Sequence, residues 1–290
     1  MKGKNSKRAI TLSVLMLVQL AISSMAPFVA SVTDGYLKVS LVKLVYAFSF
    51  VAPYVLWKRS FKPVGVSFAK HIYCEYKKPA FFVAFAAIVT FLQINIVFLE
   101  LIPSDSTSSS GGMFEGFFGF LFSLLMYALV PALTEELFSR GVVMRICGGG
   151  VKAAVLSGVL FGLCHFNPSQ LIYSIGAGVV LGLLCLYTND IKMAVYLHLC
   201  VNTTVLILSY LAMILPVGFY VAIECILWLA VLGLGIYYSN VLLRDYQRQI
   251  QQRGEEIKKN KEDIRVAEIF SPAMLVVYGA ILVATVLRYI

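Results

Sequence analysis

Residues 117–146 read FFGFLFSLLMYALVPALTEELFSRGVVMRI, an apolar run that ends in a cluster of charged side chains. The cluster contains two adjacent carboxylates, Glu135 and Glu136, and the guanidinium of Arg140. A charge inside a membrane segment is costly, so such residues usually face a helix bundle's interior and are paired. The run therefore predicts a membrane helix that carries a functional site. The alternative is a charged pair that only marks the end of a membrane helix.

Helical geometry assigns different neighbours to the two glutamates. Successive residues point about 100° apart, whereas residues four apart share a face. Glu136 and Arg140 have this spacing and are predicted to pair. Glu135 has no basic residue three or four positions further on, so its carboxylate is the one left free for chemistry.

Composition predicts an all-α, polytopic membrane protein. The 290 residues are 60% hydrophobic and 13% charged, against about 25% charged in soluble proteins. The net charge is +9, but the basic residues lie between apolar runs and form no patch with interleaved aromatics, so we expect no nucleic-acid binding. The six cysteines show no CxxC spacing and read as small hydrophobic residues, not as a disulfide framework or a thiolate metal site.

Apolar runs long enough to cross a membrane recur along the chain and predict a bundle of about eight or nine spans. They lie at roughly 9–32, 37–57, 79–102, 115–146, 151–165, 171–188, 191–214, 217–240 and 270–288. The short runs between 151 and 188 are also compatible with broken or re-entrant helices. Pro131 is expected to tilt or kink its long helix.

Lys and Arg gather in alternate loops, which predicts the orientation of the chain. They occur before residue 9, in 58–78, around 145–152, at Lys192 and in 241–269, but not in 103–112 or 167–170. We therefore expect a cytoplasmic N-terminus and, with nine spans, an external C-terminus. The first run is expected to be an uncleaved helix, not a signal peptide.

The Ser-rich stretch 104–112 resembles a linker and suggests a division into three parts. These are N-terminal spans at 1–112, a catalytic core at 113–214 and C-terminal spans at 215–290. The last part includes a charged cytoplasmic segment, 241–269, which is expected to be a solvated helix or hairpin. Glu224, inside an apolar run, is interpreted as an interhelical hydrogen-bonding residue; a proton carrier is the alternative.

Two of the three histidines lie in apolar runs, each with a notable neighbour four residues away. Phe161 precedes His165 by one turn, and His198 precedes Asn202 by one turn. Counting about 1.5 Å per residue from the cytoplasmic ends places Glu135, His165 and His198 in one layer. This predicts a catalytic cavity within the membrane.

A carboxylate, two imidazoles and an amide in such a cavity suit hydrolysis of an amide bond. Glu135 could take a proton from water that His165 holds, and His198 and Asn202 could donate to the oxyanion. Nucleophilic catalysis is less attractive because no Gly-x-Ser-x-Gly elbow is present. Cys164 adjoins His165 in sequence, so their side chains diverge on a helix.

In order and spacing, these residues resemble the pattern of the CAAX prenyl protease and bacteriocin-processing family, also called CPBP or Abi. The motifs are Glu135-Glu136-x-x-x-Arg140, Phe161-x-x-x-His165 and His198-x-x-x-Asn202. The segment Gly178-x-x-x-Gly182 and the turn at 188–190 are similar too. The resemblance covers roughly residues 115–205.

The resemblance implies an intramembrane glutamic-type endopeptidase without a cofactor. It assigns water activation to Glu135 and His165, the oxyanion hole to His198 and Asn202, and support of the site to Glu136, Arg140 and Phe161. The implied substrate is a hydrophobic, prenylated or leader-type peptide, and the implied location is among the lipids of a bacterial plasma membrane.

Three other interpretations stay open. A zinc-dependent protease would use Glu135, His165 and His198 as ligands, although the chain has no His-Glu-x-x-His motif. A non-enzymatic membrane protein, acting in immunity or as a scaffold, would use the same fold without turnover. A transporter would use the buried carboxylates to carry protons.

Overall fold

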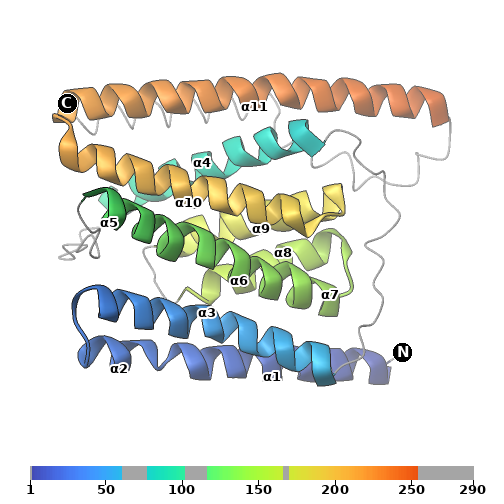
Figure 1. Ribbon diagram of the computed structural model, residues 1–290. Helices are drawn as coiled ribbons and strands as arrows, with labels where there is room; N and C mark the ends of the chain where they lie inside the picture. Colours follow the sequence, from blue (N-terminus) through green and yellow to red (C-terminus); the bar gives the residue numbers. More distant parts are fainter. Residues whose placement is uncertain (1, 61–76, 102–115, 166–169, 254–290) are drawn as a thin grey trace. The chain divides into compact units, whose positions relative to one another are not determined.

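The computed structural model describes residues 2–60, 77–101, 116–165 and 170–253, and the regular structure in these ranges is helical. Figure 1 shows the helices in chain order. They are α1 (Lys2–Ser23), α2 (Ala26–Ser31), α3 (Gly35–Ser60), α4 (Lys77–Leu101), α5 (Gly116–Ser123), α6 (Val130–Phe138), α7 (Met144–Ile146), α8 (Gly150–Leu163), α9 (Leu171–Thr188), α10 (Ile191–Ile214) and α11 (Val217–Arg253). Two π-helical segments, η1 (Leu124–Leu129) and η2 (Ser139–Val143), flank α6.

Seven helical stretches in the described ranges are long and apolar enough to cross a membrane, and α8 is a shorter apolar helix. Each predicted run that falls in these ranges coincides with a helix, so the polytopic helical bundle is confirmed. The chain is an integral membrane protein. The ninth predicted span, 270–288, lies outside the described residues. The orientation of the chain stays a prediction.

The stretch from Gly116 to Ile146 is one candidate span of 31 residues, interrupted by both π segments. Pro131 has no N–H to donate, and it lies in the first turn of α6, where a helix tolerates proline. Just before it, the N–H of Val130 bonds to the carbonyl of Leu125, five residues back. We expected Pro131 to tilt or kink the helix, and the structure has a π turn immediately before it. Such π turns are frequent at functional sites.

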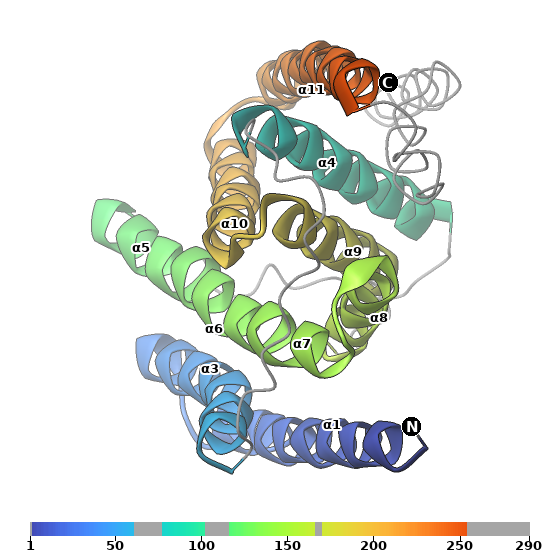
Figure 2. The ribbon, with the colours of Figure 1, turned by 90° about the vertical axis from the view of Figure 1, so that its right-hand side faces the viewer.

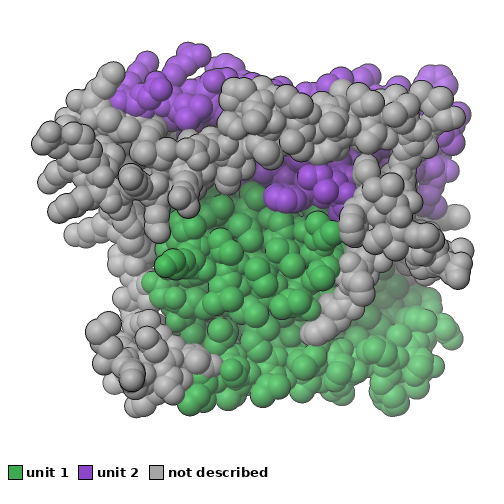
Figure 3. Space-filling view, turned by 180° about the vertical axis from the view of Figure 1, so that it is seen from behind, with its two compact units in different colours: residues 1–73, 104–207 green, residues 74–103, 208–290 purple. Residues whose placement is uncertain are grey.

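Contacts divide the chain into two units, shown in Figure 3. Residues 1–73 and 104–207 form unit 1, and residues 74–103 and 208–290 form unit 2. The functional division at 1–112, 113–214 and 215–290 stays a prediction.

In unit 2, α4 and α11 lie side by side, as Figure 1 shows. Phe82 stacks on Tyr238 with ring centroids 4.9 Å apart. Gln93 Nε2 donates a hydrogen bond to Glu224 Oε1 at 3.3 Å, so Glu224 is the interhelical hydrogen-bonding residue that we predicted. The helix α11 continues to Arg253, which confirms helix for the start of the charged 241–269 segment; its remainder lies outside the described residues.

In unit 1, α3 packs against both α1 and α6 (Figure 2). Leu15 of α1, Phe50 of α3 and Phe138 of α6 are buried in one apolar cluster. The centroids of the Phe50 and Phe138 rings are 5.8 Å apart. This contact fixes the register of α3 relative to α6, the helix that carries the two glutamates.

The helices α8 and α9 approach each other closely through glycines, as expected for helix pairs in membranes. A Cβ added at Gly178 would lie 2.9 Å from both Cα and O of Gly158, and one at Gly182 would lie 3.0 Å from the Ala154 carbonyl oxygen. No larger side chain fits at Gly178 without moving backbone. The spacing Gly178-x-x-x-Gly182 thus has a packing role.

Candidate active site

A buried ion pair joins Glu136 and Arg140 across one turn, as predicted. Arg140 Nη1 lies 2.9 Å from Glu136 Oε1, and both side chains are fully buried. Arg140 Nη2 donates to the carbonyl oxygen of Gly178, and the guanidinium lies over the Phe161 ring at 5.0 Å. Because a buried charge is tolerated only with good partners, these contacts explain how an arginine fits inside the bundle. They also join the glutamate helix to α9.

Glu136 also orients His198 from α10. His198 Nδ1 lies 2.9 Å from Glu136 Oε1. An ionised carboxylate can only accept, so Nδ1 carries the hydrogen of this bond. In a neutral ring, Nε2 is then left with its lone pair exposed to the site.

His165 is oriented in the same way by a backbone group. Its Nδ1 lies 2.9 Å from the carbonyl oxygen of Phe161, which can only accept. The Phe161 ring contacts both imidazoles edge to face, with centroids 4.8 Å from His165 and 5.8 Å from His198. The predicted packing of Phe161 one turn before His165 is confirmed, and the same ring also contacts His198.

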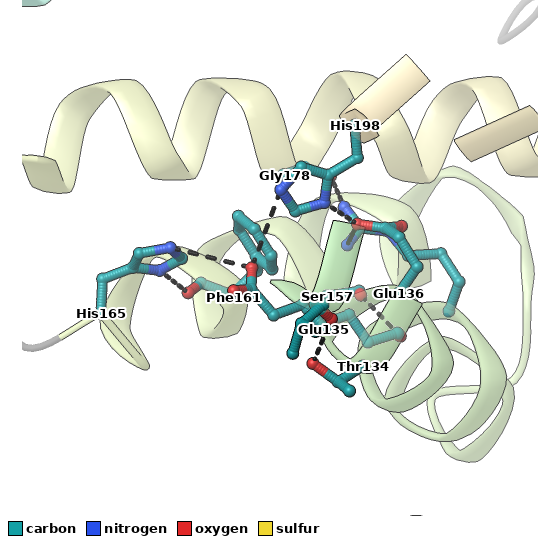
Figure 4. A network of polar contacts seen from close by, with 11 residues as sticks. Thr134, Glu135, Glu136, Ser157, Phe161, His165, Gly178 and His198 are labelled. Carbon is teal, nitrogen blue, oxygen red and sulfur yellow. Dashed lines mark hydrogen bonds and ion pairs between the residues drawn. The ribbon is translucent and has the colours of Figure 1, made fainter. Parts of the chain in front are cut away.

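Glu135 lies where the two free imidazole nitrogens converge. Its Oε2 is 3.9 Å from His165 Nε2 and 3.9 Å from His198 Nε2, and Figure 4 shows the three side chains together. The carboxylate is 3% exposed, and Oε2 accepts no hydrogen bond within the described ranges. A distance of 3.9 Å is too long for a direct hydrogen bond and suits a bridging molecule such as water. The structure thus brings together the three residues that the sequence placed in one layer.

Asn202 is the predicted site residue that this network does not include. It lies one turn beyond His198 on α10 and is partly buried. Within the part of the chain that the structure describes, no hydrogen bond joins its amide to Glu135, His165 or His198.

The donor set of two imidazoles and one carboxylate is chemically suited to zinc. Tetrahedral ligands about 2.0–2.2 Å from zinc would lie about 3.4 Å from one another, which is closer than the separations around Glu135 Oε2. Among the described residues, no group of three or more His, Cys, Asp or Glu side chains is arranged to hold a metal. Both the cofactor-free site and its zinc-dependent alternative stay predictions.

Sequence reasoning missed three side chains that act on Glu135. Tyr46 and Lys43 of α3 and Tyr173 of α9 all lie close enough to Glu135 to interact with it electrostatically. The ammonium of Lys43 lies 4.2 Å from the centroid of the Tyr127 ring. A lysine within the apolar run 37–57 is a signal that could have identified this helix.

Comparison with known families gives one match: the model of the type II CAAX prenyl endopeptidase Rce1-like family matches residues 117–204. Neither the curated proteins nor the solved structures gave a match. The matched segment runs from α5 into α10, contains every predicted site residue and leaves out α3. This segment carries the motifs on which the resemblance rests, and the match to the family model therefore confirms that resemblance.

Proposed function

We propose that this protein is an intramembrane endopeptidase that hydrolyses a peptide bond by means of a water molecule activated by Glu135 and His165. The convergence of Glu135 Oε2 with the two imidazole Nε2 atoms carries this proposal. The description of the matched family supports a membrane peptidase in general.

The proposed reaction begins with water between Glu135 and His165. His165 Nε2 accepts one hydrogen bond from this water, and Glu135 removes the other proton as the oxygen attacks the scissile carbonyl carbon. The tetrahedral intermediate then collapses. Glu135 returns the proton to the departing amine nitrogen as the carbon–nitrogen bond breaks, so the carboxylate ends in its starting state.

His198 and Asn202 are proposed to stabilise the negative oxygen of the intermediate. With Nδ1 already donating to Glu136, His198 can donate from Nε2 only as an imidazolium, a form that the Glu136 carboxylate stabilises. The Asn202 amide supplies a second donor from the next turn of α10. One such donor can be worth about 3 kcal/mol in the transition state.

The proposed substrate is a hydrophobic, prenylated or leader-type peptide that reaches the site from the membrane. The matched family and the position of Glu135 within a candidate span support this class. We also propose a bacterial plasma membrane, with a cytoplasmic N-terminus, as the location.

The test is cleavage of a panel of farnesylated and bacterial leader peptides by the purified protein. Glu135→Ala and His198→Ala are compared with wild type, and metal content is measured on the same samples. Glu224→Gln, a change of a buried membrane carboxylate in unit 2, is the matched control. Loss of turnover in both site variants of a folded, metal-free protein supports the proposal. Turnover that survives Glu135→Ala contradicts it, and stoichiometric zinc that the variants lose supports the metalloprotease instead.

A further inference from the structure

The helix α3 lies outside the matched family segment, yet it packs beside the helix that carries Glu135. In sequence it precedes Glu135, whereas both site histidines follow it. We infer that Tyr46 is a positioning residue that fixes the Glu135 carboxylate, and that Lys43 supplies the counter-charge of that carboxylate. This inference rests on the proposed function, because it gives these residues a role in preparing Glu135 for water activation.

The register between α3 and α6 places Tyr46 at Glu135. Phe50 and Phe138 are in contact and buried, which anchors the two helices to each other. Tyr46 lies one turn before Phe50, and Glu135 lies one turn before Phe138. The same packing that aligns the two phenylalanines therefore places Tyr46 beside Glu135, with which it interacts electrostatically, and we infer a hydrogen bond from the Tyr46 hydroxyl to the carboxylate. Tyr46 also contacts the Phe50 ring at 5.1 Å between centroids, so its own ring is held.

A fixed carboxylate matters because one of its oxygens, Oε2, lies at the same distance from both imidazoles. Oε2 lies 3.9 Å from both Nε2 atoms and accepts no hydrogen bond within the described ranges. A carboxylate free to rotate would spend part of its time in orientations that direct neither oxygen at the two Nε2 atoms. The inferred hydrogen bond from the Tyr46 phenol would restrict this rotation and keep Oε2 directed at the position proposed for water.

Lys43 lies three residues before Tyr46 on the same helix face and within the candidate span Gly35–Arg59. A cation at such a position is costly unless it has a partner. Among the described residues, Lys43 makes no ion pair closer than 4.0 Å, and its ammonium lies over the Tyr127 ring at 4.2 Å. Cation–π contact offsets part of the desolvation cost, and Glu135 acts on Lys43 electrostatically.

The balance of charge supports a counter-ion role. The site contains two carboxylates, of which Glu136 is paired directly with Arg140. Lys43 is the second basic side chain near these carboxylates, and its charge would offset that of Glu135, which acts on it electrostatically. Arg140 and a charged Lys43 would balance the two carboxylates in the resting site, before His198 takes up the proton that its proposed role requires.

The first test measures kcat and KM for Tyr46→Phe, Lys43→Met and Lys43→Arg on a peptide that wild type cleaves. Lys38→Met, on the same helix, is the matched control. We expect Tyr46→Phe to lower kcat about tenfold or more with KM within about twofold, because a hydrogen bond to a charged group is lost and substrate contacts are kept. We expect Lys43→Met to lower kcat and Lys43→Arg to keep most of it, since arginine retains the charge. Unchanged kcat in a folded Tyr46→Phe protein, or equal losses in Lys43→Met and Lys43→Arg, would overturn the inference.

A second test does not depend on turnover and separates this inference from the proposed function. Thermal unfolding is measured for Tyr46→Phe in the wild-type and in the Glu135→Gln background. If the two side chains interact, the shift in Tm caused by Tyr46→Phe is smaller in the Glu135→Gln background. Equal shifts in the two backgrounds would overturn the inference even if the protein is a peptidase. A smaller shift would support it even if no peptide is cleaved.

Discussion

At the scale of single residues, Glu135 and Glu136 are neighbours in sequence with different surroundings. Glu136 is engaged by Arg140 and His198, both at 2.9 Å. Glu135 has an oxygen that accepts no hydrogen bond within the described ranges and that faces two imidazoles. One carboxylate therefore supports the site, and the other is available for proton transfer.

Substitution of each glutamate by glutamine should separate these roles. Glu135→Gln is expected to reduce kcat by about 10²–10⁴-fold, the usual contribution of a general base, with little loss of stability. Glu136→Gln is expected to destabilise the protein by about 3–5 kcal/mol, because it leaves Arg140 as a buried charge without its partner. Turnover and thermal unfolding in detergent measure both effects. Equal stability losses in the two variants would contradict the assignment.

The substitution Arg140→Lys should lower the stability of the protein, although it keeps the positive charge. Its guanidinium bonds to Glu136 with one nitrogen and to the Gly178 carbonyl with the other. A lysine ammonium lacks this planar fork and leaves one acceptor unsatisfied, at a cost of about 1–3 kcal/mol. Arg244→Lys, at an exposed position of α11, should leave the Tm unchanged. Equal Tm values for Arg140→Lys and Arg244→Lys would contradict the role of the fork.

At the scale of helices, hydrophobic runs predicted which segments are helical, and spacing predicted the Glu136–Arg140 and Phe161–His165 contacts. These contacts are local, so the 3.6-residue period determines them. The π segments η1 and η2 were not predicted, because a π turn changes backbone pairing without changing the hydrophobic pattern.

The glycine contact between α8 and α9 is expected to be sensitive to a single methyl group. Gly178→Ala would place its Cβ 2.9 Å from the backbone of Gly158, so the helices must separate, and we expect a loss of about 1–3 kcal/mol. Gly233→Ala in α11 is the matched control, because nothing lies within 4 Å of an added Cβ there. Because alanine has a higher helix propensity than glycine, Gly233→Ala should leave the stability unchanged or raise it by up to about 1 kcal/mol. Thermal unfolding compares the two, and equal Tm shifts would show that the close approach is not limiting.

At the scale of the molecule, the sequence predicted the convergence of Glu135, His165 and His198 because their depths could be counted along three segments. It did not predict the contribution of Tyr46 and Lys43. Their helix is separated from the glutamates by many residues, and hydrophobic patterns do not indicate which membrane helices become neighbours. Lys43 was the visible signal, since a lysine in an apolar run needs a partner.

The alternation of basic loops predicts on which side each turn lies. With a cytoplasmic N-terminus, Asp190 between α9 and α10 should face the cytoplasm, and Pro216 between α10 and α11 should face outside. In a background without the native cysteines, Pro216→Cys should react with a membrane-impermeant maleimide in intact cells, and Asp190→Cys only after permeabilisation. The reverse pattern would invert the proposed orientation.

The discontinuity of unit 1 has a consequence for biosynthesis. This unit combines residues 1–73 with residues 104–207, so α3 is made well before the helices with which it shares the site. At about 5–20 residues per second, Lys43 enters the membrane several seconds before Glu135 has been synthesised. During that interval its charge must be accommodated by lipid headgroups or by the insertion machinery. The last site helix to be synthesised, α10, carries His198. The polar residues of the site are therefore complete only after the other helices of unit 1 have been made.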